Sequence, residues 1–208
     1  WGYHKANLQT PKLLTNGYYK NRTQTLQCCA VDTTGHETNT QDVKCFSGAS
    51  ASTDGVNVNG RVFTSSVGAE IIDLEMATNF GCVIVQSGSE NEVKCFQQSL
   101  LHEYVPSALE QIGDVSDPLD LATWGGTTAG NSSVCLLSSS KISCSDGSSL
   151  GVITNYEVDL PEQLYNAQKM SMSNSHVCVI EQRGVLCFGR NDTGQSNTVG
   201  LLNPRDIY

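Results

Sequence analysis

The stretch HVCVIEQRGVLCFGRNDTGQ, residues 176–195, carries two cysteines, at positions 178 and 187. Each lies in an apolar run of residue types that favour β-strands, and the polar segment EQRG separates the two runs. The pattern predicts a β-hairpin. Opposite residues of an antiparallel pair have numbers with a constant sum, so a turn centred between Gln182 and Arg183 places Cys178 directly opposite Cys187, within reach of a disulfide.

Three further segments share this pattern of a cysteine entering an apolar strand, a polar turn, and a returning strand that ends in Val or Ile, any residue, and Cys. The four segments are CCAVDTTGHETNTQDVKCF (28–46), CVIVQSGSENEVKCF (82–96), CLLSSSKISCS (135–145) and CVIEQRGVLCF (178–188). The predicted pairs are Cys29 with Cys45, Cys82 with Cys95, Cys135 with Cys144, and Cys178 with Cys187. The leading cysteines are 53, 53 and 43 positions apart. This spacing falls in the range of a propeller-blade repeat.

Paired cysteines can also bind zinc. Structural zinc sites favour two cysteines separated by two to four residues, and no predicted pair has that spacing. We therefore expect disulfides, with no metal ion and no cofactor. One of the nine cysteines, Cys28, is left over, and it points to the opposite side of its strand from Cys29. We favour a buried free thiol for Cys28, with an interchain disulfide as the alternative.

Composition and glycosylation motifs indicate a secreted or cell-surface protein. Asn-x-Ser/Thr motifs occur at Asn21, Asn131 and Asn191, each in a polar stretch, and disulfides form in the same oxidising compartment in which such motifs are glycosylated. The chain of 208 residues has a net charge of -9, and its twelve Lys and Arg residues are scattered, which argues against nucleic-acid binding. No apolar run approaches the roughly 18 residues of a membrane helix, so we expect no membrane insertion.

The stretch 176–195 resembles the repeat of the regulator of chromosome condensation family, in its secreted, cysteine-bearing form. The matching positions are His176, Cys178, Gly184, Val185, Cys187, Phe188, Gly189, Asn191, Gly194 and Gln195. The other three segments keep the cysteine pair, and two keep the aromatic residue, Phe46 and Phe96, but none keeps the full Gly-Asn-Gly-Gln tail. WGYHKANLQTP, residues 1–11, resembles the same tail.

The resemblance implies an all-β chain that forms a β-propeller, or a propeller arc, of about four blades, each a four-stranded antiparallel sheet. The expected boundaries are 1–11 for the end of a preceding blade or a ring-closing strand, 12–66, 67–117 and 118–161 for the first three blades, and 162–208 for the fourth blade and the lead-in to a further repeat. Innermost strands are expected within 70–81, 121–133 and 169–175, and polar connectors at 47–61, 97–118 and 145–163, with a short helix at 106–112.

The sequence contains no convincing catalytic motif. GSSLG, residues 147–151, matches the nucleophile elbow around Ser149, but a strand-like segment follows it instead of the required helix. His176 lies on a repeat position and is interpreted as a hydrogen-bonding residue of the blade. Asp114, Asp117 and Asp120 lack the spacing of a calcium loop, so we expect them in a solvated loop.

We therefore expect a non-enzymatic extracellular structural or protein-interaction module, a unit of a larger surface, filament or matrix assembly, whose partners are other proteins or further blades of the same polypeptide. The alternative is a carbohydrate-binding propeller that stacks sugars on Trp124, Tyr18, Tyr104 or Tyr156, although these aromatics do not recur at equivalent repeat positions. The nuclear exchange factor that names the family is rejected, because disulfides would not persist in a reducing compartment. We favour an open arc over a closed ring.

Overall fold

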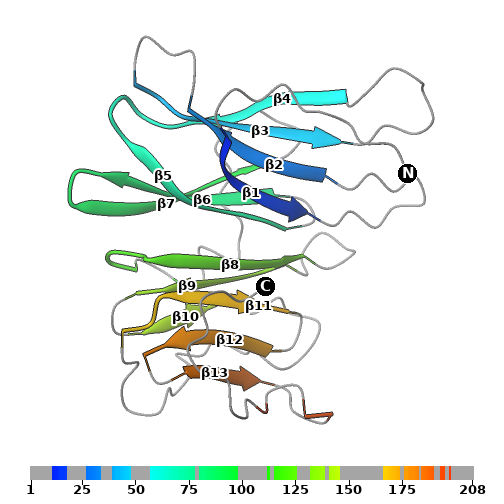
Figure 1. The fold of residues 1–208 in the computed structure, drawn as a ribbon, viewed down its shortest axis with the longest axis vertical. Coiled ribbons are helices and arrows are strands. Elements are labelled where there is room, and N and C mark those ends of the chain that lie inside the picture. Colours follow the sequence, from blue (N-terminus) through cyan, green and yellow to red (C-terminus); the bar gives the residue numbers. More distant parts are fainter. Residues whose placement is uncertain are drawn as a thin grey trace. The chain divides into compact units, whose positions relative to one another are not determined.

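A computed structural model gives the structure of the chain. The residues that it describes are 11–17, 27–33, 39–47, 57–77, 80–97, 112, 115–125, 132–138, 141–145, 166–173, 176–182, 184–189, 193–194 and 197. Their strands form four antiparallel sheets, and the chain divides into two compact units, Trp1–Val105 and Pro106–Tyr208, with two sheets in each (Figure 1). The expectation of an all-β chain is therefore confirmed at the level of its sheets.

The first unit contains sheets 1 and 2. The strands of sheet 1, in spatial order, are β1 (Pro11–Gly17), β2 (Gln27–Asp32), β3 (Asp42–Ser47) and β4 (Asn57–Thr64). Those of sheet 2 are β5 (Glu70–Met76), β6 (Phe80–Ser87) and β7 (Glu90–Gln97). Neighbours in the sequence are neighbours in each sheet, as in an antiparallel meander.

The second unit repeats this arrangement in sheets 3 and 4. Sheet 3 has the order β10-β9-β8, from β8 (Asp120–Gly125), β9 (Ser132–Leu137) and β10 (Ile142–Cys144). Sheet 4 comprises β11 (Lys169–Met172), β12 (His176–Glu181) and β13 (Gly184–Gly189). The strands expected before the leading cysteines are thus found as β5, β8 and β11, and each is followed by the two cysteine-bearing strands.

Three sequence expectations need correction or restriction. The segment 47–61 was expected to be a connector, but Asn57–Arg61 belongs to β4, where alternating Val58 and Gly60 pair with β3. Four strands per sheet hold for sheet 1, whereas sheets 2, 3 and 4 each have three strands within the described residues. Of the expected helix at 106–112, Ile112 is described and is helical, and the other residues lie outside the described part.

Each sheet has a disulfide face, which carries its paired cysteines, and an opposite face. In the first unit the disulfide face of sheet 1 packs against the opposite face of sheet 2. The core residues from sheet 1 are Cys29, Val31, Val43 and Cys45, and those from sheet 2 are Ile71, Leu74, Met76, Val83, Val85 and Phe96. The Phe63 ring of sheet 1 stacks on Phe96, with centroids 6.1 Å apart. Burying each large aliphatic side chain contributes about 1.5–3 kcal/mol to folding.

The second unit packs its two sheets in the same way. Sheet 3 contributes its disulfide face, and sheet 4 contributes its opposite face. The core residues from sheet 3 are Ala122, Cys135, Leu137, Ile142 and Cys144, and those from sheet 4 are Met170, Met172, Val177, Val179, Leu186 and Phe188. In each unit, therefore, the disulfide face of the first sheet packs against the opposite face of the second sheet.

Gly81 allows the close packing inside sheet 2. A Cβ atom at this position would overlap Met76 Sδ and would lie 2.5 Å from Phe96 Cζ. Phe96 lies opposite Gly81 in the register of β6 and β7, and it is fully buried. The Phe96 ring therefore occupies the space that a side chain at position 81 would need.

Candidate functional site

The four disulfides occupy equivalent places in the four sheets. In the structure they join Cys29 to Cys45, Cys82 to Cys95, Cys135 to Cys144, and Cys178 to Cys187. The partners of each pair lie directly opposite each other on adjacent antiparallel strands, and their Cα atoms are 4.0–4.1 Å apart. This register is the one that the constant-sum rule predicts for the hairpins. Each bond therefore holds the base of one hairpin within one sheet.

The disulfide face of sheet 4 is more exposed than its equivalents. Cys178 and Cys187 are half-buried, and so is Val185, while Ile180 beside them is buried. At the positions equivalent to Val185, Val43 of sheet 1 and Ile142 of sheet 3 are buried under the next sheet of their unit, and Val93 of sheet 2 is half-buried. The disulfide face of sheet 4 is therefore apolar and partly exposed, whereas the disulfide faces of sheets 1 and 3, which have a similar composition, are covered.

Gln41 links sheet 1 to the first strand of sheet 2. Its side-chain Oε1 accepts a hydrogen bond from the backbone N–H of Ile71 at 2.6 Å, and the backbone N–H of Gln41 donates to Ser65 Oγ at 2.9 Å. Ser65 Oγ in turn donates to the Ala69 carbonyl at 3.1 Å. These bonds fix the connector between β4 and β5, at whose tip Val67 is 72% exposed.

Asp120 makes the corresponding link in the second unit. Its Oδ2 accepts the backbone N–H of Met170 in β11 at 2.5 Å, and both residues are 5% exposed. The expectation that Asp120 lies in a solvated loop is therefore wrong, because this carboxylate is the first residue of β8 and serves as a buried acceptor between sheets 3 and 4. Asp117 is exposed with a positive φ of 53°, and Asp114 lies outside the described residues.

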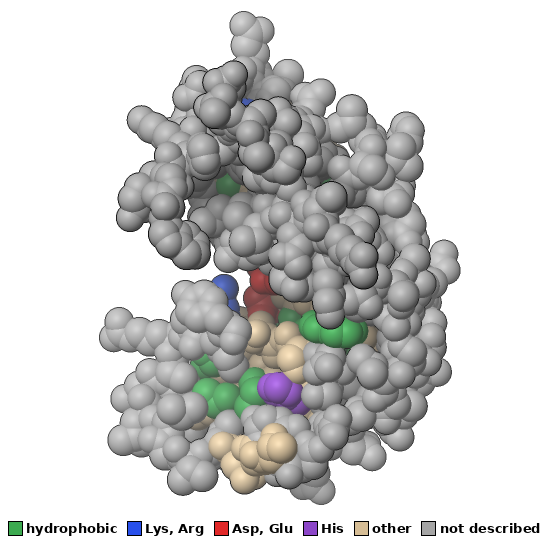
Figure 2. Space-filling view, turned by 90° about the vertical axis from the view of Figure 1, so that its right-hand side faces the viewer, with side chains coloured by type: hydrophobic (Ala, Val, Ile, Leu, Met, Phe, Trp, Pro, Cys, Tyr) green, Lys and Arg blue, Asp and Glu red, His purple; other side chains and the backbone are tan. Residues whose placement is uncertain are grey.

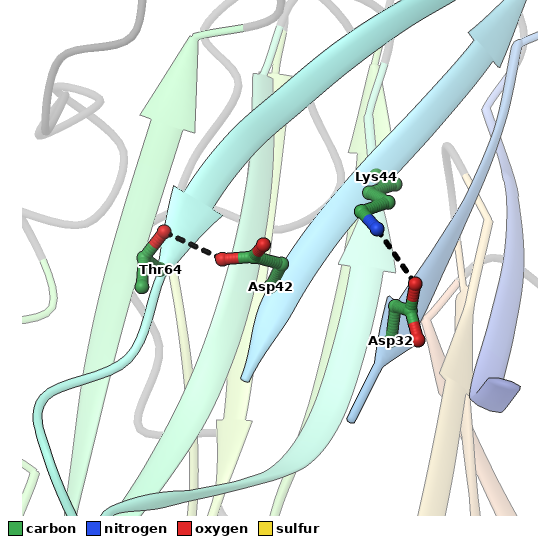
Figure 3. Close-up of polar contacts among 4 residues, drawn as sticks. All are labelled: Asp32, Asp42, Lys44 and Thr64. Atoms are coloured by element: carbon green, nitrogen blue, oxygen red, sulfur yellow. Dashed lines mark hydrogen bonds and ion pairs between the residues drawn. The ribbon is translucent and has the colours of Figure 1, made fainter. Parts of the chain in front are cut away.

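A polar group lies on the opposite face of sheet 1, near the β2–β3 hairpin (Figure 3). Asp32 and Asp42 lie directly opposite each other and are 1% and 4% exposed. Lys44 Nζ forms an ion pair with Asp32 Oδ2 at 2.6 Å, and Thr64 Oγ1 donates to Asp42 Oδ1 at 2.7 Å. Each buried carboxylate thus has a donor of its own, which makes this group a structural element of the hairpin base.

His176 has the structural role that the sequence interpretation assigns to it. Its Nδ1 lies 2.8 Å from Ser173 Oγ, and its carbonyl accepts the Ser173 N–H at 2.9 Å, closing the turn between β11 and β12. The equivalent turn of sheet 2 is closed by the same bond, from Ala77 N–H to the Phe80 carbonyl. His176 is the only histidine among the described residues, and Figure 2 shows a histidine side chain in purple beside hydrophobic side chains in green.

Several predicted residues lie outside the described part of the chain: Asn21, Asn131, Asn191, Ser149, Tyr18, Tyr104 and Tyr156. Cys28 is described in its backbone, which pairs with Asn16 and Phe46, but not in its side chain. Trp124 is half-buried at the end of β8. The equivalent strand ends carry Ala77 and Ser173, so the described repeats share no aromatic there.

Neither metal ligation nor membrane spanning is indicated by the described residues. No group of three or more His, Cys, Asp or Glu side chains among them has the geometry of a metal site. Within the same residues, no helix combines the length and the apolar character needed to cross a bilayer.

Comparisons with known proteins assign no family. No protein-family model matches the chain, and no curated protein sequence matches it. Among solved structures, the chain aligns with the crystal structure of the CRINKLY WD40 ectodomain from the Arabidopsis thaliana receptor kinase ACR4 at 13% identity, with a TM-score of 0.36. The alignment covers 85% of this chain and spans 64% of the length of that structure. The resemblance to the regulator of chromosome condensation family stays a prediction.

Proposed function

We propose that the chain is a non-enzymatic, extracellular protein-interaction module that serves as a structural unit of a larger assembly. The observation that carries this proposal is that the disulfide face of sheet 4 is less buried than the disulfide faces of sheets 1 and 3. Sheets 1 and 3 cover their disulfide faces with the next sheet, whereas Cys178, Val185 and Cys187 on the disulfide face of sheet 4 are half-buried. An apolar sheet face of this kind favours association with another protein surface.

The disulfides support the extracellular part of the proposal. Every sheet holds one disulfide, and such bonds persist in secreted and cell-surface proteins but are reduced in the cytosol. The proposed architecture is an open propeller arc with blades at 12–66, 67–117, 118–161 and 162–208. In this arc the disulfide face of sheet 4 is the end surface, which makes contacts with a partner protein or a further blade.

Sedimentation of the oxidised 208-residue chain tests the proposal. We expect reversible association at micromolar concentration, weakened about tenfold or more in Val185→Glu, because the variant brings an unpaired carboxylate into an apolar contact. Val67→Glu is the matched control, since Val67 is exposed and belongs to the other unit. Circular dichroism must show that both variants fold. A chain that stays monomeric at every concentration and melts cooperatively, or two variants that associate alike, would contradict the proposal.

A further inference from the structure

The eight paired cysteines fall into two classes by burial. The cysteines of sheets 1, 2 and 3 are between 0% and 5% exposed. Cys178 and Cys187 of sheet 4 are half-buried. One disulfide of the chain is therefore more exposed than the other three.

The two cysteines differ in the number of described strands beside them. β12 is the central strand of sheet 4, so Cys178 has Ser171 of β11 on one side and Cys187 of β13 on the other. β13 is an edge strand within the described residues. Among the described strands, β11 and β13 flank Cys178, and only β12 flanks Cys187, so we expect an incoming thiolate to attack Cys187.

We propose that Cys178–Cys187 is a thiol–disulfide exchange site on the surface of the protein, while the other three disulfides are structural. The thiolate of a small thiol or of a partner protein attacks Cys187 Sγ. A new disulfide forms between the incoming sulfur and Cys187, and Cys178 leaves as a thiolate that takes up a proton. A second thiolate then releases Cys187, so that two thiols are oxidised to one disulfide as the Cys178–Cys187 bond gains two electrons.

The fold of sheet 4 does not depend on this bond alone. Six opposite pairs, from His176–Gly189 to Glu181–Gly184, hold β12 against β13. The residues that anchor sheet 4 in the core lie on its opposite face, among them Val177, Val179 and Leu186. Exchange at Cys187 thus changes the chemistry of the disulfide face and leaves the core packing in place. The site can take a mixed disulfide with a thiol-bearing partner.

The Cys135–Cys144 bond is a matched control, because it has the same sequence separation of 9, lies in the same unit, and is buried. The native protein is treated with reduced glutathione, quenched with acid, alkylated and digested with trypsin, which cleaves between the cysteines of each pair, after Arg183 and Lys141. We expect Cys178–Cys187 to open about tenfold faster or more than Cys135–Cys144, because opening the buried bond requires local unfolding. Equal rates, or an earlier opening of any other pair, would overturn the proposal.

Two further readouts separate exchange from general loosening. At early times the glutathione adduct should be found mainly on Cys187, and a predominant adduct on Cys178 would refute attack from the sheet edge. The double variant Cys178→Ser, Cys187→Ser should keep a cooperative melt and lose less thermal stability than Cys135→Ser, Cys144→Ser. If the first double variant is the one that unfolds, the bond is structural and the proposal fails.

Discussion

Replacing Asp120 with alanine removes the side-chain link between sheets 3 and 4. The Asp120 carboxylate accepts the Met170 N–H at 2.5 Å, and each of the two residues is 5% exposed. Alanine leaves that amide without its acceptor in a site that solvent barely reaches. We expect the second unit to lose stability without a change in its strand content.

The magnitude follows from the type of bond. A hydrogen bond to a charged group contributes about 1.5–3 kcal/mol, and a buried amide left unpaired costs about 1–3 kcal/mol. These two figures describe the same loss, so we expect Asp120→Ala to lower the free energy of unfolding by about 2–3 kcal/mol. For a chain of this size, this corresponds to a fall in Tm of about 4–12 °C. Asp120→Asn keeps an oxygen acceptor and should lose about 1 kcal/mol.

Thermal and urea unfolding, followed by circular dichroism, measure these differences. Asp117→Asn is the matched control, because Asp117 is an exposed aspartate in the preceding connector and asparagine tolerates its φ of 53°, so its replacement should change stability by less than about 0.5 kcal/mol. The order of stability should be wild type, then Asp120→Asn, then Asp120→Ala. An Asp120→Ala protein that melts together with the Asp117→Asn protein would refute the assignment of Asp120 as a buried anchor.

Three other predictions concern the sheets and the modifications. Gly81→Ala should destabilise the protein by about 1–3 kcal/mol in urea unfolding, because its Cβ would overlap Met76 and Phe96, whereas Gly88→Asn, with open space and a φ of 64° that Asn tolerates, should have little effect. An amidase that releases N-glycans should lower the mass of protein secreted from a glycosylating host, with sites at Asn21, Asn131 and Asn191; an unchanged mass removes that support for secretion. Cys28 should react with iodoacetamide only after unfolding, since the equivalent residues Gly81, Val134 and Val177 are buried, and rapid labelling of the native protein would contradict a buried thiol.

The repeat could be predicted from the sequence because its signals are local. A cysteine in each strand and a polar turn between them fix the hairpin register, so the position of Cys178 opposite Cys187 follows from 20 consecutive residues. The strands β5, β8 and β11 could be located because each precedes a leading cysteine. β4 was missed in part, because its Asn57–Arg61 half alternates Asn, Gly and Val and reads as a polar connector.

The links between sheets could not be predicted, because their partners are far apart in the sequence. Asp120 and Met170 are 50 residues apart, and Gln41 and Ile71 are 30 apart. The segment that contains Asp117, Pro118 and Asp120 has the composition of a solvated loop. Only the packing of β11 against β8 makes Asp120 a buried acceptor. The unequal burial of the four disulfides likewise depends on which sheet faces are covered, which the cysteine spacing does not encode.

Disulfide mapping without reduction tests most directly whether each repeat is a separate sheet with a disulfide of its own. Trypsin cleaves after Lys44, Lys94, Lys141 and Arg183, between the two cysteines of every pair, and cleavage after glutamate at Glu103 or Glu110 separates Cys95 from Cys135. The account predicts four linked peptide pairs, Cys29 with Cys45, Cys82 with Cys95, Cys135 with Cys144 and Cys178 with Cys187, with the alkyl label on Cys28 alone. A bond between cysteines of two different repeats would contradict it.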